Sequence, residues 1–469
     1  MANSDLGTLG IVGLGVMGAS LARNAHEKGV RVVGYERSDE LRAAFAKGEF
    51  GGEIELCADL ASFVEALPRP RRVFLMVTAG AAVDSVIQSL HRLLEPGDAV
   101  ADGGNSHFED TERRAAVLGE LGIHFVGTGV SGGQEGARRG PCMMPGGTRE
   151  GWEVFRPVYE AIAARTPAGP CVAHMGPGGA GHFVKMVHNG IEYGAMQLLA
   201  EAYDCLRRVM DAEADECANT FARWNEGDLG SFLVEISAKI LAKRDDDGEP
   251  LVQKVLGRAE QKGTGRWTVA AALDLGIPIP TIAAGLDARS LSSRLDLRRR
   301  IAARTRGVIP GGEYELDDHA LHDALLLAHA VCYAQGLDLL RSASSEKGYD
   351  LDLARIATIW QGGCIIRAEM LKAVADAYTE QRDLEHLLEA RAFDAMAATH
   401  HGALRRVVGS ATQHGVAIPA LSASLAYLDA LRTEHLPTNL VQAQRDAFGS
   451  HGVVRIDDPE GRKVHLGWT

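Results

Sequence analysis

The sequence predicts an α/β domain with a doubly wound parallel sheet, followed by a large all-α domain and a C-terminal tail. Up to about residue 180, short apolar runs alternate with helix-compatible stretches. Beyond that point, long stretches have helical spacing and strand-like alternation is scarce. A chain of 469 residues also exceeds the size at which one hydrophobic core keeps growing, so two or more domains are expected.

The predicted strands of the first domain are short apolar runs that end in glycine or other small residues. Strands that alternate with helices through right-handed crossovers form a doubly wound parallel sheet. The runs are TLGIVG (8–13), VRVVGY (30–35), VFLMV (73–77), AVADGG (99–104) and IHFVGTGVSGG (123–133).

The second domain is predicted to be nearly all helical, because its long stretches are rich in Ala, Leu, Glu and Arg. The Gly/Pro-rich segment GPGGAG (176–181) is the natural boundary, which divides the chain into 1–180 and 181–437. From about residue 436 onward we expect an irregular tail (438–469) with little to bury by itself. The stretches with helical spacing are 182–210, 211–224, 318–343 and 364–390.

The composition narrows the function classes. A hydrophobic content of 46% with 24% charged residues is ordinary for a soluble globular protein. A net charge of −13 makes nucleic acid and anionic membranes unexpected partners. The seven cysteines are scattered without a C-x-x-C pair or metal-ligand spacing, which indicates reduced thiols in a cytoplasmic protein and no metal site. No leader-like segment and no run of about 18 apolar residues occurs, so neither export nor membrane spanning is expected.

A glycine-rich segment follows the first predicted strand and opens a helix. Glycine at its first, third and sixth positions permits a tight turn, close approach of the backbone to a pyrophosphate, and helix–strand packing. With its flanking strand and helix, the segment predicts a Rossmann-type dinucleotide site, the alternative being a glycine-rich turn without a ligand. It consists of Gly13, Leu14, Gly15, Val16, Met17 and Gly18.

A polar cluster, Glu36-Arg37-Ser38, follows the second predicted strand. Glu36 stands where an acidic residue would accept hydrogen bonds from the adenosine ribose of NAD, and its charge would repel the 2′-phosphate of NADP. Arg37 has the opposite effect, since a guanidinium can pair with that phosphate or stack on adenine. The residues alone leave both cofactors open.

The stretch KMVHNGIEYG (185–194) holds five polar side chains. Read as a helix at about 100° per residue, these side chains fall on one stripe and would present a possible base, a possible acid and hydrogen-bonding groups to one spot. The alternative is a solvated helix face with an i,i+3/i,i+4 charge pair. The five residues are Lys185, His188, Asn189, Glu192 and Tyr193.

Two glycine-dense segments are expected to be turns at strand ends, where an open α/β sheet binds its ligands. They are DGGNS (102–106), with Asn105, and VSGGQEGARRGPCMMPGG (130–147). In the second, Ser131, Gly132 and Gly133 could direct backbone N–H groups at an anion. Ordinary turn chemistry is the alternative for both.

Further basic and hydroxyl groups lie far apart in the sequence. Lys262 and Thr264 stand among glycines in QKGTGRWT, which suits phosphate binding although the P-loop spacing is lacking; a helix-capping loop is the alternative. Arg289, Arg445 and His451 are connected by no spacing rule, and from physics alone each reads as a surface charge.

Together these motifs resemble the 6-phosphogluconate dehydrogenase family, the decarboxylating enzymes of the pentose phosphate pathway. The resemblance runs through nearly the whole chain. It implies a Rossmann-type domain, a large helical domain and a tail that reaches into the partner subunit of a homodimer. The blocks that carry it are IVGLGVMG, DGGNS, VSGGQEGARRGP, GHFVKMVHNGIEYG, QKGTGRW, YAQG (333–336), WQGGCIIR (360–367) and NLVQAQRDAFGSHG.

The resemblance also implies roles for individual residues. Lys185 matches the general base that takes the proton from the substrate 3-hydroxyl, and Glu192 matches the general acid that protonates C1 of the enediol after CO₂ leaves. No metal is needed in this chemistry. The positions that match substrate binding are His188, Asn189, Asn105, Ser131, Gly132 and Gly133 around the sugar acid, Tyr193, Lys262, Thr264 and Arg289 around the phosphate, and Arg445 and His451 from the partner's tail.

The cofactor site departs from the family pattern at two positions. Val77, Thr78 and Ala79 are expected to contact the cofactor. Glu36 replaces the asparagine of typical NADP-dependent members, and Thr78 stands where a lysine is expected. One change adds a negative charge and the other removes a positive one, so we expect use of NAD, or of both cofactors, despite Arg37. Asn105 is expected to contact the cofactor as well as the substrate.

Two other functions remain as alternatives. A β-hydroxyacid dehydrogenase for a shorter substrate, such as 3-hydroxyisobutyrate, shares the glycine fingerprint and a catalytic lysine but has no comparable phosphate-binding set or long helical domain. This alternative rests on fold-level analogy. A catalytically idle dinucleotide-binding protein would be expected to lack Lys185 or Glu192, and both are present.

Overall fold

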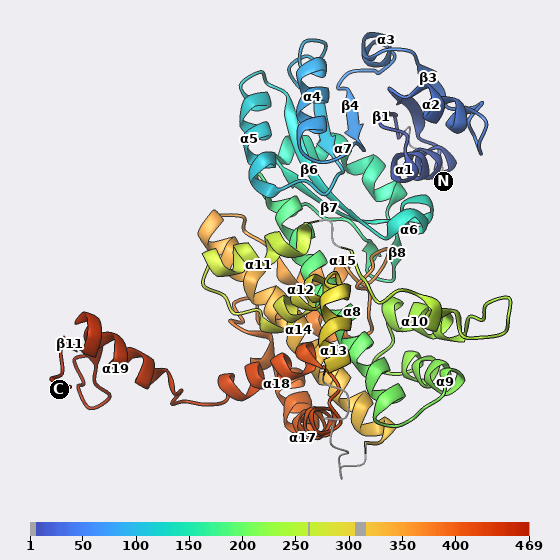
Figure 1. Ribbon diagram of the computed structural model, residues 1–469. Coiled ribbons are helices and arrows are strands. Elements are labelled where there is room, and N and C mark those ends of the chain that lie inside the picture. Colours follow the sequence, from blue (N-terminus) through green and yellow to red (C-terminus); the bar gives the residue numbers. More distant parts are fainter. Residues whose placement is uncertain (1–5, 261–262, 305–315, 469) are drawn as a thin grey trace.

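The computed structural model describes residues 6–260, 263–304 and 316–468 of the chain. Figure 1 shows an α/β domain, a helical domain below it, and a C-terminal tail that stands apart from the body of the chain. The predicted fold class is therefore confirmed.

The α/β domain is built on a seven-stranded sheet in the order β3-β2-β1-β4-β5-β6-β7. Neighbouring strands from β3 through β6 pair in parallel, and the chain moves outward from β1 first to one side and then to the other. This reversal places a ligand crevice at the carboxyl ends of β1 and β4. The strands are β1 (Thr8–Val12), β2 (Arg31–Tyr35), β3 (Glu55–Cys57), β4 (Arg72–Leu75), β5 (Ala99–Asp102), β6 (His124–Ser131) and β7 (Cys142–Gly147).

The prediction of a single turn over 130–147 is wrong. The segment contains the end of β6, helix α6 (Gly133–Arg139) and β7, which pairs antiparallel with β6 from Ser131↔Cys142 to Val126↔Gly147. Fully buried Met143 and Met144 give β7 its apolar content, which the surrounding glycines mask in the sequence. The remaining elements of this domain are α1 (Val16–Glu27), α2 (Asp39–Ala46), α3 (Leu60–Glu65), α4 (Ala81–Leu90), α5 (Phe108–Gly119), α7 (Arg149–Ile162) and the small hairpin β8 (Arg165–Thr166) and β9 (Gly169–Pro170).

Two long helices form the centre of the helical domain. Helix α8 (Ala180–Arg208) begins against β6 and β7 and then packs on α11, α12 and α14. Helix α14 (Asp318–Lys347) is mostly buried beside it. The others are α9 (Ala214–Asn225), α10 (Phe232–Ala242), η1 (Leu251–Lys254), α11 (Thr264–Asp274), α12 (Pro280–Ser292), α13 (Leu295–Arg304), α15 (Leu353–Ile359), α16 (Met370–Glu380), η2 (Leu387–Glu389), α17 (Arg391–Gln413) and α18 (Pro419–Leu431).

Helix α8 is held against the sheet and against the end of the helical domain. A Cβ at Gly181 would lie 2.2 Å from the carbonyl oxygen of Gly127, and one at Gly129 would lie 2.4 Å from Cβ of Lys185. At the other end, the buried Glu201 carboxylate accepts hydrogen bonds from the backbone N–H groups of Ala420 and Leu421, each at 2.8 Å, at the start of α18. These contacts fix the helix that joins the two domains.

Two further predictions need correction. Only residues 370–380 of the stretch 364–390 form an α-helix, because the flanking residues make a loop that packs on the sheet and an irregular segment containing η2. The tail is not irregular throughout: it contains α19 (Thr438–Gly449) and a hairpin of β10 (Val453–Val454) and β11 (Lys463–Val464). Among the helices that the structure describes, none has the length and apolar character required to cross a membrane.

Candidate active site

The five polar residues predicted to share a stripe lie on helix α8. Lys185, His188, Asn189 and Tyr193 are buried, and Glu192 keeps 22% of its side chain exposed. Residues spaced by three and four positions lie on the same face of a helix. The alternative of a solvated charged face is therefore wrong.

His188 connects the residues at the centre of this stripe. Its Nδ1 lies 3.4 Å from Lys185 Nζ, 3.1 Å from Asn189 Oδ1 and 4.0 Å from Glu192 Oε2. Its Nε2 lies 3.1 Å from the Oγ of Ser131 at the end of β6. The imidazole therefore couples the helix to the carboxyl edge of the sheet.

Burial moves the titratable groups of the stripe toward their neutral forms. It lowers the pKa of Lys185, although the nearby Glu192 carboxylate opposes the shift. It raises the pKa of Glu192, against the charges of Lys185 and Arg289. Burial and then the charge of Lys185 hold the pKa of His188 well below its usual range. Both shifts bring the groups closer to the forms that general base and general acid catalysis require, a free amine at Lys185 and a protonated carboxyl at Glu192.

The loop after α15 packs against the stripe on α8 and against the end of β6. The sequence alone predicted no role for this loop. The fully buried Trp360 ring meets the His188 ring edge-on at 5.6 Å. The backbone N–H of Ile365 donates to Ser131 Oγ at 3.4 Å, and the carbonyl of Gly363 accepts from the N–H of Cys142 on β7. Gly132 and Gly133 follow Ser131 with φ of 115° and 63°, a left-handed conformation that only glycine adopts at low cost.

Three of the residues predicted to bind phosphate, Tyr193, Thr264 and Arg289, come together at the Tyr193 end of the stripe. The guanidinium of Arg289 lies 3.6 Å from the centre of the Tyr193 ring. Helix α11 begins at buried Thr264, and a Cβ on the next residue, Gly265, would lie 2.6 Å from the Tyr193 ring. Lys262 lies outside the described residues.

A cavity of about 370 Å³ lies at the carboxyl ends of β1, β2 and β4. Gly13 there has φ of 94°, and a Cβ at Gly18 would lie 1.9 Å from the carbonyl oxygen of Gly13, so both positions require glycine. A Cβ at Gly15, the N-cap of α1, would meet nothing within 4 Å. The backbone at this helix start is therefore open to a pyrophosphate. Of the predicted cofactor residues, Gly13, Gly15, Glu36, Arg37, Val77 and Thr78 line it.

The Glu36 carboxylate also joins two backbone segments beside this cavity. Its carboxylate accepts hydrogen bonds from the backbone N–H groups of Leu14, at 2.8 Å, and Ser38, at 2.9 Å. One oxygen is therefore bound to the glycine-rich loop and the other to the turn before α2. Arg37 is exposed on the same cavity wall. The geometry fixes a negative charge where the adenosine ribose is expected.

The turn that carries Asn105 is organised by Asp102, which sequence reasoning missed. Asp102 is fully buried at the end of β5, where its carboxylate accepts from Gly104 N–H at 3.0 Å and from Ser106 Oγ at 2.6 Å. Arg114 lies 3.5 Å from the same carboxylate. Asn105 is left exposed at the edge of the sheet. The signal was an acidic residue at the end of an otherwise apolar run.

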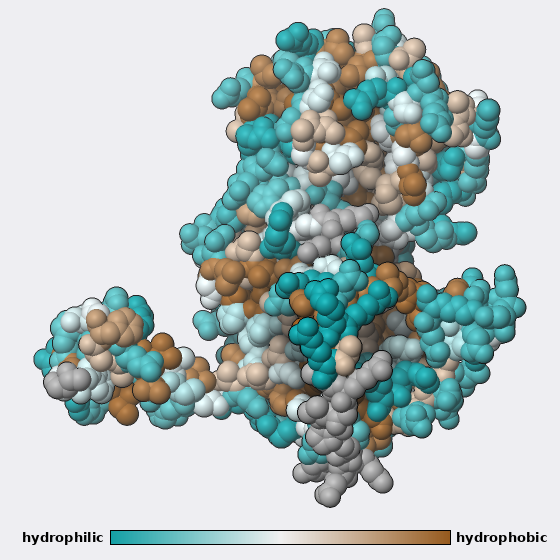
Figure 2. Space-filling view, viewed as in Figure 1, coloured by the Kyte–Doolittle hydropathy of each residue, from teal (hydrophilic) through white to brown (hydrophobic). Residues whose placement is uncertain are grey.

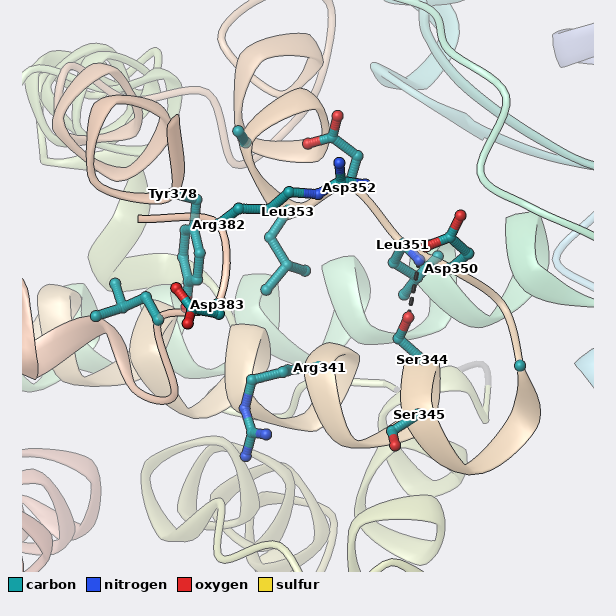
Figure 3. A pocket seen from close by; sticks show the side chains of 13 residues that line it. Arg341, Ser344, Ser345, Asp350, Leu351, Asp352, Leu353, Tyr378, Arg382 and Asp383 are labelled. Atoms are coloured by element: carbon teal, nitrogen blue, oxygen red, sulfur yellow. Dashed lines mark hydrogen bonds between the residues drawn. The ribbon is translucent and has the colours of Figure 1, made fainter. Parts of the chain in front are cut away.

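Arg445 and His451 are not brought to the other site residues within this chain. Both are exposed in the tail, on α19 and on the turn that follows it (Figure 1). A separate cavity of about 490 Å³ lies where α14 ends and α15 begins, lined by Arg341, Asp350 and Tyr378 among others (Figure 3). None of the predicted site residues lines it. Within the part of the chain that the structure describes, no three His, Cys, Asp or Glu side chains are arranged to hold a metal ion.

Comparison with known proteins covers both domains. Residues 8–176 match the family described as the NAD binding domain of 6-phosphogluconate dehydrogenase, and residues 181–468 match the 6-phosphogluconate dehydrogenase C-terminal domain. The chain is 44% identical to the NADP(+)-dependent, decarboxylating 6-phosphogluconate dehydrogenase of Bacillus subtilis, over 96% of this chain and 97% of that protein. It is 47% identical to the decarboxylating enzyme of Synechococcus elongatus, over 98% of both chains.

A solved structure is similar over the same length. Plasmodium falciparum 6-phosphogluconate dehydrogenase, studied with its cofactor NADP+ and its substrate 6-phosphogluconate, superposes with a TM-score of 0.93 at 38% identity. The match covers 98% of this chain and 100% of that one. The likeness therefore includes both domains and the tail.

Proposed function

The chain belongs to the 6-phosphogluconate dehydrogenase family, and we propose that it catalyses the oxidative decarboxylation of 6-phospho-D-gluconate to D-ribulose 5-phosphate and CO₂, with reduction of NAD or NADP. One observation carries the proposal. Lys185 and Glu192 share a face of α8, and burial shifts the pKa of each toward the form that base and acid need. Turnover of 6-phosphogluconate, with CO₂ measured alongside reduced cofactor, tests it.

In the first step, the neutral amine of Lys185 takes the proton of the substrate 3-hydroxyl as a hydride leaves C3. The bound nicotinamide supplies the hydride acceptor. The product is a 3-keto acid, whose carbonyl can accept the electron pair of the breaking C1–C2 bond when CO₂ leaves. Protonated Lys185, held beside His188 at 3.4 Å, is placed to stabilise the negative charge that develops on the C3 oxygen.

In the last step, the protonated carboxyl of Glu192 delivers a proton to the carbon that lost CO₂. The resulting ketone is D-ribulose 5-phosphate. Glu192 lies about two turns from Lys185 along α8, on the same face, so the two groups face the same bound sugar. Bound substrate anion raises the pKa of a neighbouring carboxyl further, which keeps the acid protonated until it is used.

We propose that the carboxylate end of the substrate lies near His188 and Asn189, and that its phosphate lies near Tyr193 at the other end of the stripe. Ser131, His188 and Asn189, with Asn105, Gly132 and Gly133, are proposed to bind the hydroxyls and the carboxylate. Tyr193, Thr264 and Arg289, with Lys262, are proposed to bind the phosphate, and the Arg289–Tyr193 contact supports this end. Concentrated positive charge here explains how a chain of net charge −13 can hold an anion.

For the cofactor, we propose use of NAD, alone or together with NADP. The Glu36 carboxylate, fixed by Leu14 and Ser38, supports this choice because it would repel a 2′-phosphate. Thr78 lines the same cavity without a positive charge. Arg37 acts in the opposite direction, since it is the exposed cation on that wall.

The wild-type chain is expected to use NAD, alone or together with NADP. Glu36→Gln combined with Thr78→Lys is expected to raise the ratio of kcat/KM for NADP to that for NAD by about tenfold or more, because a repulsion is removed and an attraction added. Initial rates with each cofactor at saturating 6-phosphogluconate measure the ratio. Glu40→Gln, an exposed charge change on α2, is the matched control. A wild-type preference for NADP above tenfold would contradict the proposal.

We also propose a homodimer in which the tail (438–469) of each chain completes the site of the other. Figure 2 shows hydrophobic side chains on the surface of the tail lobe. Phe448 is 76% exposed and Ile456 is 94% exposed, and burial of these large apolar side chains against a second copy would stabilise the dimer. The expected result is a sedimentation mass of twice the chain mass of 50.1 kDa. A monomer at micromolar concentration would contradict the shared site.

We propose a cytoplasmic location because the cysteine thiols are unpaired. All seven cysteines are free and buried. Unpaired buried thiols are typical of proteins that remain in a reducing compartment.

A further inference from the structure

Asp446 is a charged residue enclosed within the tail. It is the buried residue of α19, with 4% of its surface exposed, whereas Arg445 beside it is exposed. A carboxylate is costly to bury unless hydrogen-bond donors surround it. The hydrogen-bond donors around the Asp446 carboxylate therefore indicate its structural role.

Four donors from later segments converge on this one carboxylate. Oδ1 accepts from the backbone N–H of Gly452 at 2.8 Å and lies 2.8 Å from Nδ1 of His465. Oδ2 accepts from the backbone N–H of Leu466 and from the indole N–H of Trp468, each at 2.9 Å. Because an ionised carboxylate only accepts, His465 must donate through Nδ1. These donors hold the pKa of Asp446 far below its usual range.

The hydrogen bonds tie three pieces of the tail together. The turn after α19 has left-handed φ angles at Ser450 (51°) and Gly452 (74°), and Asp446 holds it through the Gly452 N–H. The chain then passes through the β10–β11 hairpin and returns, so that residues 465–468 close on the same carboxylate. Without this anion the four donors would have no common partner.

Arg445 and His451 are the immediate neighbours of this network. Arg445 precedes Asp446, and its Nη1 donates to Gln442 Oε1 at 3.1 Å. The Gln442 amide in turn donates to the Gly452 carbonyl at 2.7 Å. His451 precedes Gly452, whose N–H Asp446 holds. The spacing between the two cationic groups is thus set by contacts that Asp446 organises.

We propose that Asp446 is a positioning residue, whose carboxylate locks the turn at 450–452 and the chain end onto α19 so that Arg445 and His451 are presented together to the phosphate of a substrate bound in a second copy of this chain. This inference rests on the proposed function and on the exchange of tails. It adds that residues 465–468 help to position Arg445 and His451 through Asp446, without touching substrate.

The test is the full-length Asp446→Asn variant. Its amide nitrogen would face two N–H donors that now share one carboxylate oxygen, so part of the network is lost. We expect the KM for 6-phosphogluconate to rise about tenfold or more, because charged hydrogen bonds to the phosphate are weakened, while the KM for the cofactor stays within about twofold. Asp457→Asn removes an exposed carboxylate of the same tail and is expected to leave both constants unchanged.

A milder variant covers the case in which Asp446→Asn unfolds the tail. Trp468→Phe removes one of the four donors and keeps an aromatic ring, so we expect a rise in the same KM of about two- to threefold. Equal changes in the constants for substrate and cofactor would instead indicate general destabilisation and overturn the positioning role.

Hybrid dimers show in which subunit Asp446 acts. In a hybrid of an Asp446→Asn chain with a Lys185→Met chain, the one competent site combines Lys185 of the first with the intact tail of the second. Only half of the sites in this hybrid are active, and their KM for 6-phosphogluconate is expected to equal the wild-type value. A KM that stays raised would overturn the proposal. If the wild-type chain turns over 6-phosphogluconate and the Asp446→Asn variant has the same KM, only the positioning role is overturned. If the wild-type chain is inactive on 6-phosphogluconate, the proposed function is overturned as well.

Discussion

Lys185→Met is expected to lower kcat for 6-phosphogluconate by about 10³- to 10⁴-fold, because it removes both the general base and the cation that stabilises the C3 oxygen. The side chain that replaces it is similar in volume and apolar, so the buried position on α8 tolerates it. Lys185→Arg is expected to be equally inactive, since a guanidinium stays protonated at all working pH values.

Single-turnover measurements separate this loss of chemistry from a loss of folding or binding. In the Lys185→Met variant no fast formation of reduced cofactor is expected, because the base acts in the hydride-transfer step itself. Cofactor affinity should stay within about twofold of wild type, since the cavity at β1 and β4 does not include residue 185. Lys372→Met, an exposed lysine on α16, is the matched control. A variant that retains more than a tenth of wild-type kcat would show that another group is the base.

Glu192→Gln is expected to lower steady-state kcat by about 10²- to 10³-fold through a different step. Glutamine keeps the shape and polarity of the side chain but cannot deliver a proton. Because Glu192 acts after oxidation and loss of CO₂, one equivalent of reduced cofactor per site should form at nearly the wild-type rate, followed by slow turnover. A stopped-flow trace at 340 nm (the absorbance of a reduced nicotinamide) measures both phases, and CO₂ should appear with the first. A first phase slowed as much as the steady state would contradict the assignment.

The pH dependence follows from the same pKa shifts. Activity requires Lys185 without its proton and Glu192 with it. Burial lowers the pKa of Lys185 and raises that of Glu192, so each group shifts toward the form that activity requires. The profile of kcat should therefore be bell-shaped, low when Lys185 is protonated and low when Glu192 is ionised. In Glu192→Gln one of the two limbs should disappear, and an unchanged bell would contradict the acid role.

Much of the architecture could be predicted because its signals are local. The five expected strands lie within one to three residues of β1, β2, β4, β5 and β6, since each is a short apolar run bounded by small residues. The stripe on α8 followed from helical periodicity, which a sequence displays directly. The glycines of the first turn likewise have a local reason, the left-handed φ of Gly13 and the close contact at Gly18.

The missed features depend on partners that are distant in sequence. Strand β7 is recognisable only beside β6, because its glycines hide the apolar pattern. Asp102 reads as an acid at the end of a strand until its contact with Arg114 on α5 is known. Asp446 looks like an exposed helix residue until the chain end folds back onto it after about 20 residues. In each case a non-local contact outweighs the local preference.

The sequence by itself determined the fold class, the family and the residue types that the reaction needs, since periodicity, glycine spacing and long specific motifs are properties of the chain alone. Only the tertiary structure decided which of these residues meet and in which direction their pKa values shift. Burial shifts the pKa of Lys185 and Glu192 toward neutrality, and burial is set by α11, α12, α14 and the sheet, which pack around α8. Folding likewise brings backbone N–H donors to the carboxylates of Glu36 and Asp446. The role of each carboxylate depends on these donors.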